Sequence, residues 1–564
     1  MLNKQIHGII SFLITIVGPV VSLLITPSWS VDPVNQPKML VISIVGMIFL
    51  GIYLVSLKSI ISRKNSLLLA LCVLFIFQLC VVLFTSSGPF NQQFYGVFGR
   101  NTGFISYFNL ALICIGAFLV ATPKLITQVG LGFIFAGAIS VGYSLLQTFD
   151  ADPIKWNNPY NSIVAFLGNP NFQSSFLGML GSLLLAFCFK KQTSIIYRAL
   201  AGFGILVSLM LIIRSKSQQG LIVLGLGMAL VIFIFFLSFG SKNRKLILIS
   251  YGSLTSVVGL LTVLGTLKIG PLGEILYKLS VRQRGYYWNA AIEMIKSNPI
   301  NGVGLDSYGD WYFGVRSAGA ALNTPKVTSN SAHSVFLDIG SNGGIPLLAI
   351  YIGLVALTLR SILKYLRRNQ EFNWAYAGLV SVWVGYQAQS VISINQLGLA
   401  IWGWLLMGLL IGIEVNSREK SNVNTQSVIK GKGFSKISKK NNSSSSLAYI
   451  SAALSLTIGL FIVFPVFLND MNSRKSSSGR SAEALIATVL KQPEDTERTI
   501  EAAQILARSN LLPQALQLVN HVIEINPRAY NAWELRLQIT DPSSPDYQSI
   551  KDKLNFLNPR VPIK

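Results

Sequence analysis

Apolar residues along the chain gather into long runs that short polar segments separate. Many of these runs reach the roughly 20 residues that an α-helix needs to cross a hydrocarbon core about 30 Å thick. The pattern therefore predicts an all-α, polytopic membrane protein with about 12–13 transmembrane helices. The expected spans lie near residues 8–26, 39–58, 66–86, 104–121, 125–147, 172–189, 197–213, 219–239, 245–267, 334–358, 375–394, 398–413 and 447–468.

Composition supports this class and removes a competing one. Hydrophobic residues make up 51% of the 564 residues, charged residues only 12%, and the mean hydropathy is +0.53. The net charge of +24 would suit a nucleic-acid-binding protein, but most Lys and Arg residues lie in short loops between apolar runs. That distribution is typical of the positive-inside rule, so we expect no nucleic-acid partner. The four cysteines lie within or at the ends of apolar runs, which predicts packing rather than a disulfide or a metal site.

The positive charges also orient the chain. With the N-terminus in the cytoplasm, the inside loops are rich in Lys and Arg, whereas the opposite loops carry only a few. Residues 268–333 then form a large external loop between spans nine and ten, with the pattern of a helix lying along the membrane surface. The cations in the short external loops are Arg100, Lys155, Arg214 and Lys216.

The end of the chain has a different character. Residues 416–446 read as a basic polar linker, residues 447–468 as an additional transmembrane helix, and residues 480–564 as a charged helical tail on the external side. The apolar positions of the tail favour helical pairs of the tetratricopeptide type. We expect a docking or stabilising module there, with a possible protein partner. The polytopic domain itself is expected to cover residues 1–415.

Candidate chemistry lies at the outer ends of the spans, because the spans themselves hold almost no acids or bases. Polar motifs there include "GVFGRNTG", "FLGNPNFQSS", "RSKSQQG" and the segment around His333. Arg and Lys suit a phosphate or diphosphate, and a histidine can take a proton from a hydroxyl. Together they indicate transfer from a phosphate-activated donor in the membrane to an alcohol. Asp306 and Asp310 have no third acid or histidine beside them, so we expect solvated loop aspartates rather than metal ligands.

Two segments carry a family resemblance. The run "RGYYWNAAIEMIKSNPINGVGLDSY" resembles the R-x-x-x-W…A…P-x-x-G-x-G signature of the bacterial O-antigen ligase and polymerase superfamily. The run "AHSVFLDIGSNGGIPLL" resembles the His-led segment that opens the family's next transmembrane helix. "FGRNTG" and "GNPN" are similar to its outer-loop motifs. The resemblance covers most of residues 1–415.

The resemblance implies a metal-independent, cofactor-free and inverting membrane glycosyltransferase. Such an enzyme moves a glycan from a polyprenyl-diphosphate-linked donor to a hydroxyl of a lipid core, a growing glycan or a protein. Its active site lies on the periplasmic, external side of the bacterial cytoplasmic (inner) membrane, in contact with membrane lipids. By motif position, Arg284 matches the loop arginine that engages the diphosphate, and His333 matches the histidine that activates the acceptor hydroxyl.

The chain departs from the family pattern at Ser334, where asparagine is common, at Asn342, where an acid is common, and at one further place that affects the diphosphate site. A second arginine normally opens the span that begins near residue 219, and this chain has glutamine there. Arg214 or Lys216 is the candidate replacement on the diphosphate, with Arg100 as a further cation. The possible substrate contacts are Asn169, Asn171 and Gln218.

Other functions stay open at this stage. Without the resemblance, His333 reads as a packing residue at a helix start and Arg284 as a solvated surface charge. A transporter or flippase for an anionic solute or lipid-linked sugar would need internal repeats and polar groups at mid-membrane, and neither is evident. A scaffold that acts through the tail is the third alternative.

Overall fold

A computed structural model describes residues 3–61, 67–156, 163–240, 242–277, 279–429, 444–477 and 481–563. Within these ranges the protein is built from helices and contains no strand. The membrane bundle contains α1 (Lys4–Leu23), α2 (Asn35–Ile61), α3 (Leu67–Thr85), α5 (Phe104–Leu119), α6 (Pro123–Thr148), α7 (Pro170–Cys188), α8 (Ile195–Arg214), α9 (Gln218–Leu237), α10 (Arg244–Thr266), α15 (Val335–Arg368), α16 (Trp374–Ile392), α17 (Leu397–Ile429) and α18 (Ser444–Ser477).

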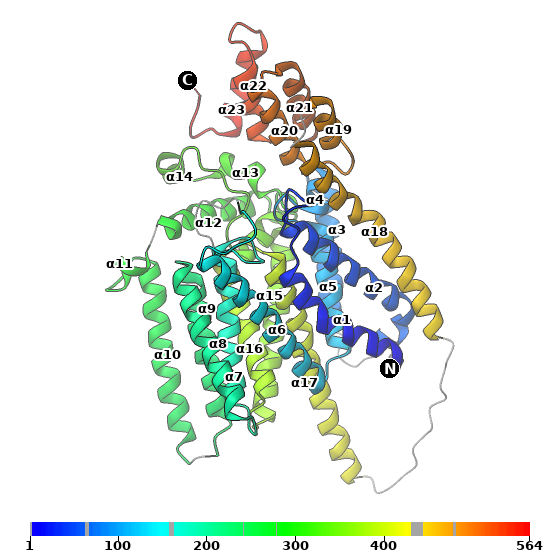
Figure 1. The fold of residues 1–564 in the computed structure, drawn as a ribbon, viewed down its shortest axis with the longest axis vertical. Coiled ribbons are helices and arrows are strands. Elements are labelled where there is room, and N and C mark those ends of the chain that lie inside the picture. The colour runs from blue at the N-terminus through cyan, green and yellow to red at the C-terminus, as the bar shows by residue number, and fades with distance from the viewer. Residues whose placement is uncertain are drawn as a thin grey trace.

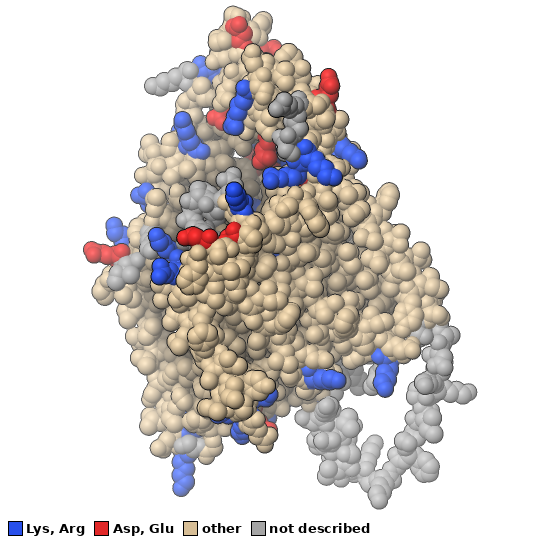
Figure 2. All heavy atoms as spheres, viewed as in Figure 1, with Lys and Arg blue, Asp and Glu red and all other residues tan. Residues whose placement is uncertain are grey.

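Eleven described helices are long and apolar enough to cross a membrane, which confirms the all-α polytopic class. The expected spans at 104–121 and 375–394 correspond to α5, a shorter apolar helix, and α16, which is not among the eleven. α16 is less apolar because it carries Ser381, Gln389 and Ser390, whose side chains are buried inside the bundle. On the face seen in Figure 2, a broad band of the bundle shows no charged side chains, with charges above and below it.

The bundle is organised around α17. The first part of this helix is buried on all sides and packs against α5, α15, α1 and α16. Gly408 lies so close to the backbone of Cys114 on α5 that a Cβ atom would collide with it. α10 is the opposite case, since it packs on α9 and α11 and its apolar side chains face outward. Such a surface suits contact with lipid.

The segment between α10 and α15 folds over one end of the bundle, and we call this end the loop face (Figure 1). A short helix after α3 also lies there. The loop-face helices are α4 (Phe90–Tyr95), α11 (Gly273–Leu276), α12 (Leu279–Ser297), α13 (Tyr308–Val315) and α14 (Ala318–Asn323).

α18 packs along α2 and leads the chain to the loop face, where the tail lies over α13 and contacts it through its last helix (Figure 1). The Asp470 carboxylate on α18 accepts hydrogen bonds from the backbone N–H groups of Val31 and Asp32, at 3.0 and 3.2 Å, and lies 3.8 Å from Arg498. The tail and residues 268–333 therefore share one side of the bundle. The tail helices are α19 (Ala482–Val489), α20 (Thr496–Arg508), α21 (Leu512–Ile525), α22 (Tyr530–Ile539) and α23 (Asp546–Leu557).

The segment expected as a linker begins as helix, because α17 continues to Ile429. Residues 430–443 of that segment, and residues 480 and 564 of the tail, lie outside the described residues.

Candidate functional site

Backbone pairing joins the two motif segments. Near Gly344, which has a φ of +78°, α15 is broken, and Pro346 follows. Loop amides bond to the carbonyls around this break: Val303 N donates to Ser341 O at 2.8 Å, and Gly304 N donates to Asn342 O at 3.2 Å. This pairing holds the end of α12 against the first turns of α15.

Glycine is required where the two backbones meet. Gly302 has a φ of +62°, and a Cβ atom there would lie 2.5 Å from the carbonyl carbon of Asn342. An L-residue is strained at that φ, and the space is already filled. The P-x-x-G-x-G pattern therefore has a structural purpose: it lets the loop carrying Arg284 pack directly on the helix that follows His333.

Asp338 holds the loop that carries His333. This carboxylate, one turn into α15, accepts hydrogen bonds from Ser331 Oγ at 2.7 Å and from Ala332 N at 2.6 Å. Ser331 Oγ in turn accepts a hydrogen bond from His333 N at 2.9 Å. His333 has a φ of +52°, in the left-handed region that few side chains other than Asn and Asp adopt readily. The surrounding bonds thus impose a strained backbone that directs the imidazole.

The imidazole of His333 is neutral at physiological pH. It is half-buried and stacks on the Tyr287 ring of α12, with centroids 5.2 Å apart. Burial, and to a lesser degree the positive charges of Arg100 and Arg284, lower the pKa of His333 to about 3. A neutral imidazole keeps one ring nitrogen as a proton acceptor. The predicted histidine thus lies within electrostatic range of two of the predicted cations, Arg100 and Arg284.

Arg284 differs from Arg100 in how its charge is balanced. Asp338 and Asp306 both oppose the charge of Arg100 and raise its pKa, whereas the pKa of Arg284 is lowered by burial and raised by Tyr287, with no carboxylate contributing among the described residues. Arg284 Nε and the neighbouring Trp288 Nε1 are buried and have no hydrogen-bond partner among the described residues. Buried N–H donors normally have partners, so this pair is suited to an anionic ligand.

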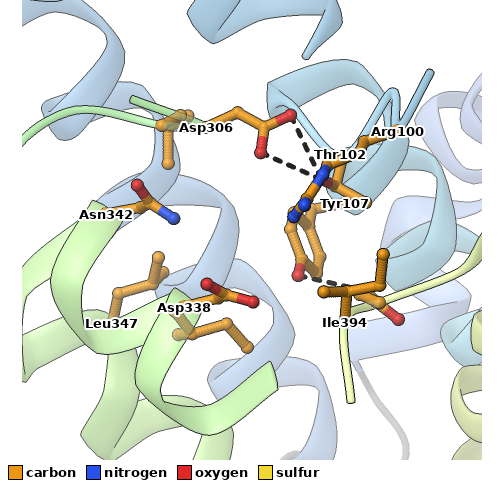
Figure 3. Close-up of a pocket in the computed structure, with 11 residues that line it drawn as sticks. Arg100, Thr102, Tyr107, Asp306, Asp338, Asn342, Leu347 and Ile394 are labelled. Atoms are coloured by element: carbon orange, nitrogen blue, oxygen red, sulfur yellow. Dashed lines mark hydrogen bonds between the residues drawn. The ribbon is translucent and has the colours of Figure 1, made fainter. Parts of the chain in front are cut away.

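Arg100 lies beside a small cavity of about 30 Å³. Figure 3 shows Asp306, from the loop, and Asp338, from α15, both pointing toward it. Asp306 accepts hydrogen bonds from Val97 N at 2.8 Å and from Thr102 Oγ1 at 3.1 Å, and so ties residues 97–102 to the loop. A cavity of this size holds about one water molecule. A diphosphate does not fit in it.

The expectation of solvated aspartates at 306 and 310 is wrong. Asp306 is buried, and burial raises its pKa while Arg100 lowers it. Asp310 accepts hydrogen bonds from Gln92 Nε2 at 2.8 Å and from Asn526 Nδ2 of the tail at 2.9 Å. The sequence pattern could not reveal either bond, because the partners are distant in the chain.

The remaining predicted residues lie at the loop-face ends of α7, α8 and α9. Asn169 caps α7 by accepting a hydrogen bond from Asn171 N at 2.8 Å, and Asn171 Oδ1 accepts one from Ser217 Oγ at 2.9 Å. Gln218 is the first residue of α9. Arg214 and Lys216 are exposed at the α8–α9 turn and are not among the charged groups that shift the His333 pKa. The structure thus places Arg100 and Arg284 beside His333 and gives these other residues structural contacts or an exposed position.

Sequence reasoning missed Asp338 and Tyr287 as parts of the site. Asp338 carried a usable signal, because an acid within an apolar span is costly and generally has a purpose. Tyr287 carried none, since an aromatic residue on an amphipathic helix is expected in any case.

Comparison with known proteins gives one match. Residues 203–352 match the sequence model of the family described as O-Antigen ligase. A search of curated proteins found no match. The matched region runs from α8 into α15 and includes both Arg284 and His333, but not Arg100. It supports the resemblance and, in general terms, an activity that transfers glycans in a multi-pass membrane protein.

Proposed function

We propose that this protein transfers a glycan from a polyprenyl-diphosphate-linked donor to a hydroxyl acceptor at the loop face, with inversion and without a metal ion. The loop face is then the external side of a bacterial cytoplasmic membrane, where the donor lipid lies. One observation carries the proposal: within the matched region, the charge of Arg284 acts on a neutral histidine, and the buried Arg284 Nε has no hydrogen-bond partner in the described part of the chain.

In the proposed reaction, His333 accepts the proton of the acceptor hydroxyl as the acceptor oxygen attacks the anomeric carbon. The bond between that carbon and the diphosphate oxygen breaks, and the polyprenyl diphosphate leaves from the opposite face of the sugar, which inverts the anomeric centre. Arg284 and Trp288 Nε1 stabilise the negative charge on the leaving group. Arg100 keeps the loop in position and adds positive charge. Arg214 and Lys216 are secondary candidates for the diphosphate, and Asn169, Asn171 and Gln218 for sugar contacts.

The low pKa of His333 makes it a weak base in the free protein. In the proposed mechanism, binding of the donor raises this pKa. Burial is the main cause of the low value, and Arg100 and Arg284 add to it. A bound diphosphate brings negative charge to the same place and opposes the two arginines. We therefore expect donor binding to raise the pKa of His333, so that the base becomes effective only when the donor is present.

The test is a transfer assay on the full-length protein in lipid, with a lipid-diphosphate-linked glycan and its acceptor. His333→Ala should lower kcat by about 10²–10⁴-fold, as expected for loss of a general base. Arg284→Ala should lower transfer strongly as well. The matched control is Arg282→Ala, which removes an exposed arginine from the same helix and should keep activity. Full activity of both His333→Ala and Arg284→Ala would overturn the assignment, and donor counterflow without any acceptor would favour transport.

A further inference from the structure

A second cavity lies between the tail and the loop face. It has a volume of about 240 Å³. One wall comes from α20 and the start of α22, and the other from α13, residues 328–330 and residues 92–98. Asn330 in this wall is three residues from His333, and three extended residues span at most about 10 Å. The cavity is therefore within a few sugar units of the proposed catalytic base.

Specific contacts hold the tail in place over the loop. The guanidinium of Arg528 lies 3.5 Å from the centre of the Trp311 ring, and the Tyr530 ring lies 4.4 Å from that of Phe313. Arg316 donates a hydrogen bond to Asn558 Oδ1 at 3.0 Å. Aromatic and cation–π contacts of this kind contribute roughly 0.5–2 kcal/mol each. The cavity is thus formed by a defined interface and not by loose surface loops.

The cavity wall is acidic. Glu497, Glu501 and Asp310 all line it, and no Lys or Arg does so among the described residues. The side chains of Glu497 and Glu501 make no hydrogen bond or ion pair within the described part of the chain. Burial, together with Asp495, Asp310 and Glu501, raises the pKa of Glu497 to about 7. The negative charge of such a wall repels a diphosphate. Its protonated and ionised carboxyl groups can donate and accept hydrogen bonds with a neutral ligand.

The rest of the wall is suited to sugars. Asn330 and Asn531 add amide donors and acceptors, while Phe98, Phe313 and Tyr530 add aromatic surface. A sugar ring presents hydroxyl groups around its edge and apolar C–H groups on its faces, so it needs this mixture. The volume lies just below the roughly 300–1,000 Å³ of pockets for drug-sized ligands, which suits one or two rings rather than a long glycan.

We propose that this cavity binds a neutral sugar unit of a glycan acceptor whose reacting hydroxyl lies at His333. The proposal rests on the proposed function, and it selects a carbohydrate acceptor over a purely lipid or protein one. It also gives the tail a role in binding, since six of the fifteen lining residues come from α20 and the start of α22. The donor diphosphate stays at Arg284, on a surface of opposite charge.

The test measures sugar binding without any donor. Full-length protein is placed in lipid nanodiscs, because alkyl-glycoside detergents would themselves compete as sugars. Saturation-transfer NMR then detects maltotriose, cellotriose, mannotriose and chitotriose, with trigalacturonate as an anionic comparison. We expect at least one neutral trisaccharide to bind and trigalacturonate to bind more weakly.

Variants locate the bound sugar. At pH 8, above the Glu497 pKa of about 7, the double change Glu497→Gln and Glu501→Gln should weaken binding at least about fivefold, because hydrogen bonds to charged groups are the stronger ones. Glu524→Gln removes one exposed carboxylate from α21 of the same tail and should leave binding unchanged. Asn531→Ala provides a milder change in the same wall, with an expected weakening of about threefold. Thermal unfolding of each variant checks that the tail is folded.

The outcomes separate this proposal from the proposed function. The cavity assignment is overturned if none of the four neutral trisaccharides binds, if binding is unchanged in both cavity variants, or if trigalacturonate binds equally well. His333→Ala should keep trisaccharide binding. If His333→Ala and Arg284→Ala both retain transfer, the catalytic assignment fails while the binding result is unaffected, because no donor is present in that measurement.

Discussion

The two sites at the loop face share one loop and differ in charge. Residues 329–333 border both, with Asn330 in the tail cavity and His333 beside Arg284 and Arg100. The inner site presents the Arg284 guanidinium, with Arg100 opposed by Asp306 and Asp338, whereas the tail cavity presents carboxyl groups. In the proposed reaction, the diphosphate donor would bind at the first environment and the neutral glycan acceptor at the second. The difference in charge would then direct each substrate to its own site.

Removing the Asp338 carboxylate, which holds the loop that carries His333, should have the largest effect on transfer. Asp338→Ala deletes the acceptor for Ser331 Oγ and Ala332 N, so the His333 ring loses its direction. We expect kcat to fall by about 10²-fold, as for a misplacement of about 1 Å, with little change in the KM for donor. Asp338→Asn, which keeps an acceptor oxygen, should recover part of the loss. Equal changes in kcat and KM would contradict a positioning role.

Breaking the contact between residues 302–304 and α15 should have the second largest effect, in this case on the stability of the fold. Gly302→Ala places a methyl group against the backbone of Asn342 at a positive φ, and we expect a loss of at least about 2 kcal/mol in the free energy of unfolding. Gly285→Ala is the matched control, since a Cβ atom there meets nothing within 4 Å and α12 gains a better helix former. Thermal unfolding in nanodiscs distinguishes them. Equal stability of the two variants would refute the close packing.

The pH dependence tests the influence of the donor on His333. With a pKa of about 3, the imidazole of the free protein stays neutral from pH 8 to pH 5, so kcat/KM for donor should be flat there. In the donor complex the diphosphate opposes Arg100 and Arg284, the pKa rises, and protonation on acidification removes the base. We expect kcat to fall about tenfold from pH 7.5 to pH 5.5. A flat kcat profile would argue against this coupling, and Arg282→Ala should reproduce the native profile.

Loosening the tail should have the smallest effect. Arg528→Ala removes the cation–π contact with Trp311, and trisaccharide binding should weaken about threefold while kcat with saturating substrates changes little. Arg508→Ala removes an exposed arginine from the end of α20 and serves as the control. A large drop in kcat with Arg528→Ala would show that the tail contributes to the inner site directly.

Much of the inner site was predictable, and the tail cavity was not. His333 and Arg284 could be found because each belongs to a continuous motif of characteristic residues. Asp338 could also be found from the sequence, by a different argument, because an acid within an apolar span is costly and generally has a purpose. Asp306, Asp310, Glu497 and Asn531 carried no such signal. Their neighbours come from segments far apart in the chain, and charged or polar loop residues are solvated by default.

A comparison of α10 and α17 shows what hydropathy predicts and what it leaves undetermined. Residues Arg244–Thr266 and Leu397–Arg418 have the same mean hydropathy of 1.9, yet the most apolar window of the first is 0% buried within the protein and that of the second 100%. Lipid and protein interior are both apolar, so hydropathy identifies a span without identifying its neighbours. The sequence by itself determined the membrane class, most of the spans and the two motifs. Only the tertiary structure decided which spans surround α17, which cations lie beside His333, and that the tail closes over the loop, because these depend on packing between distant segments.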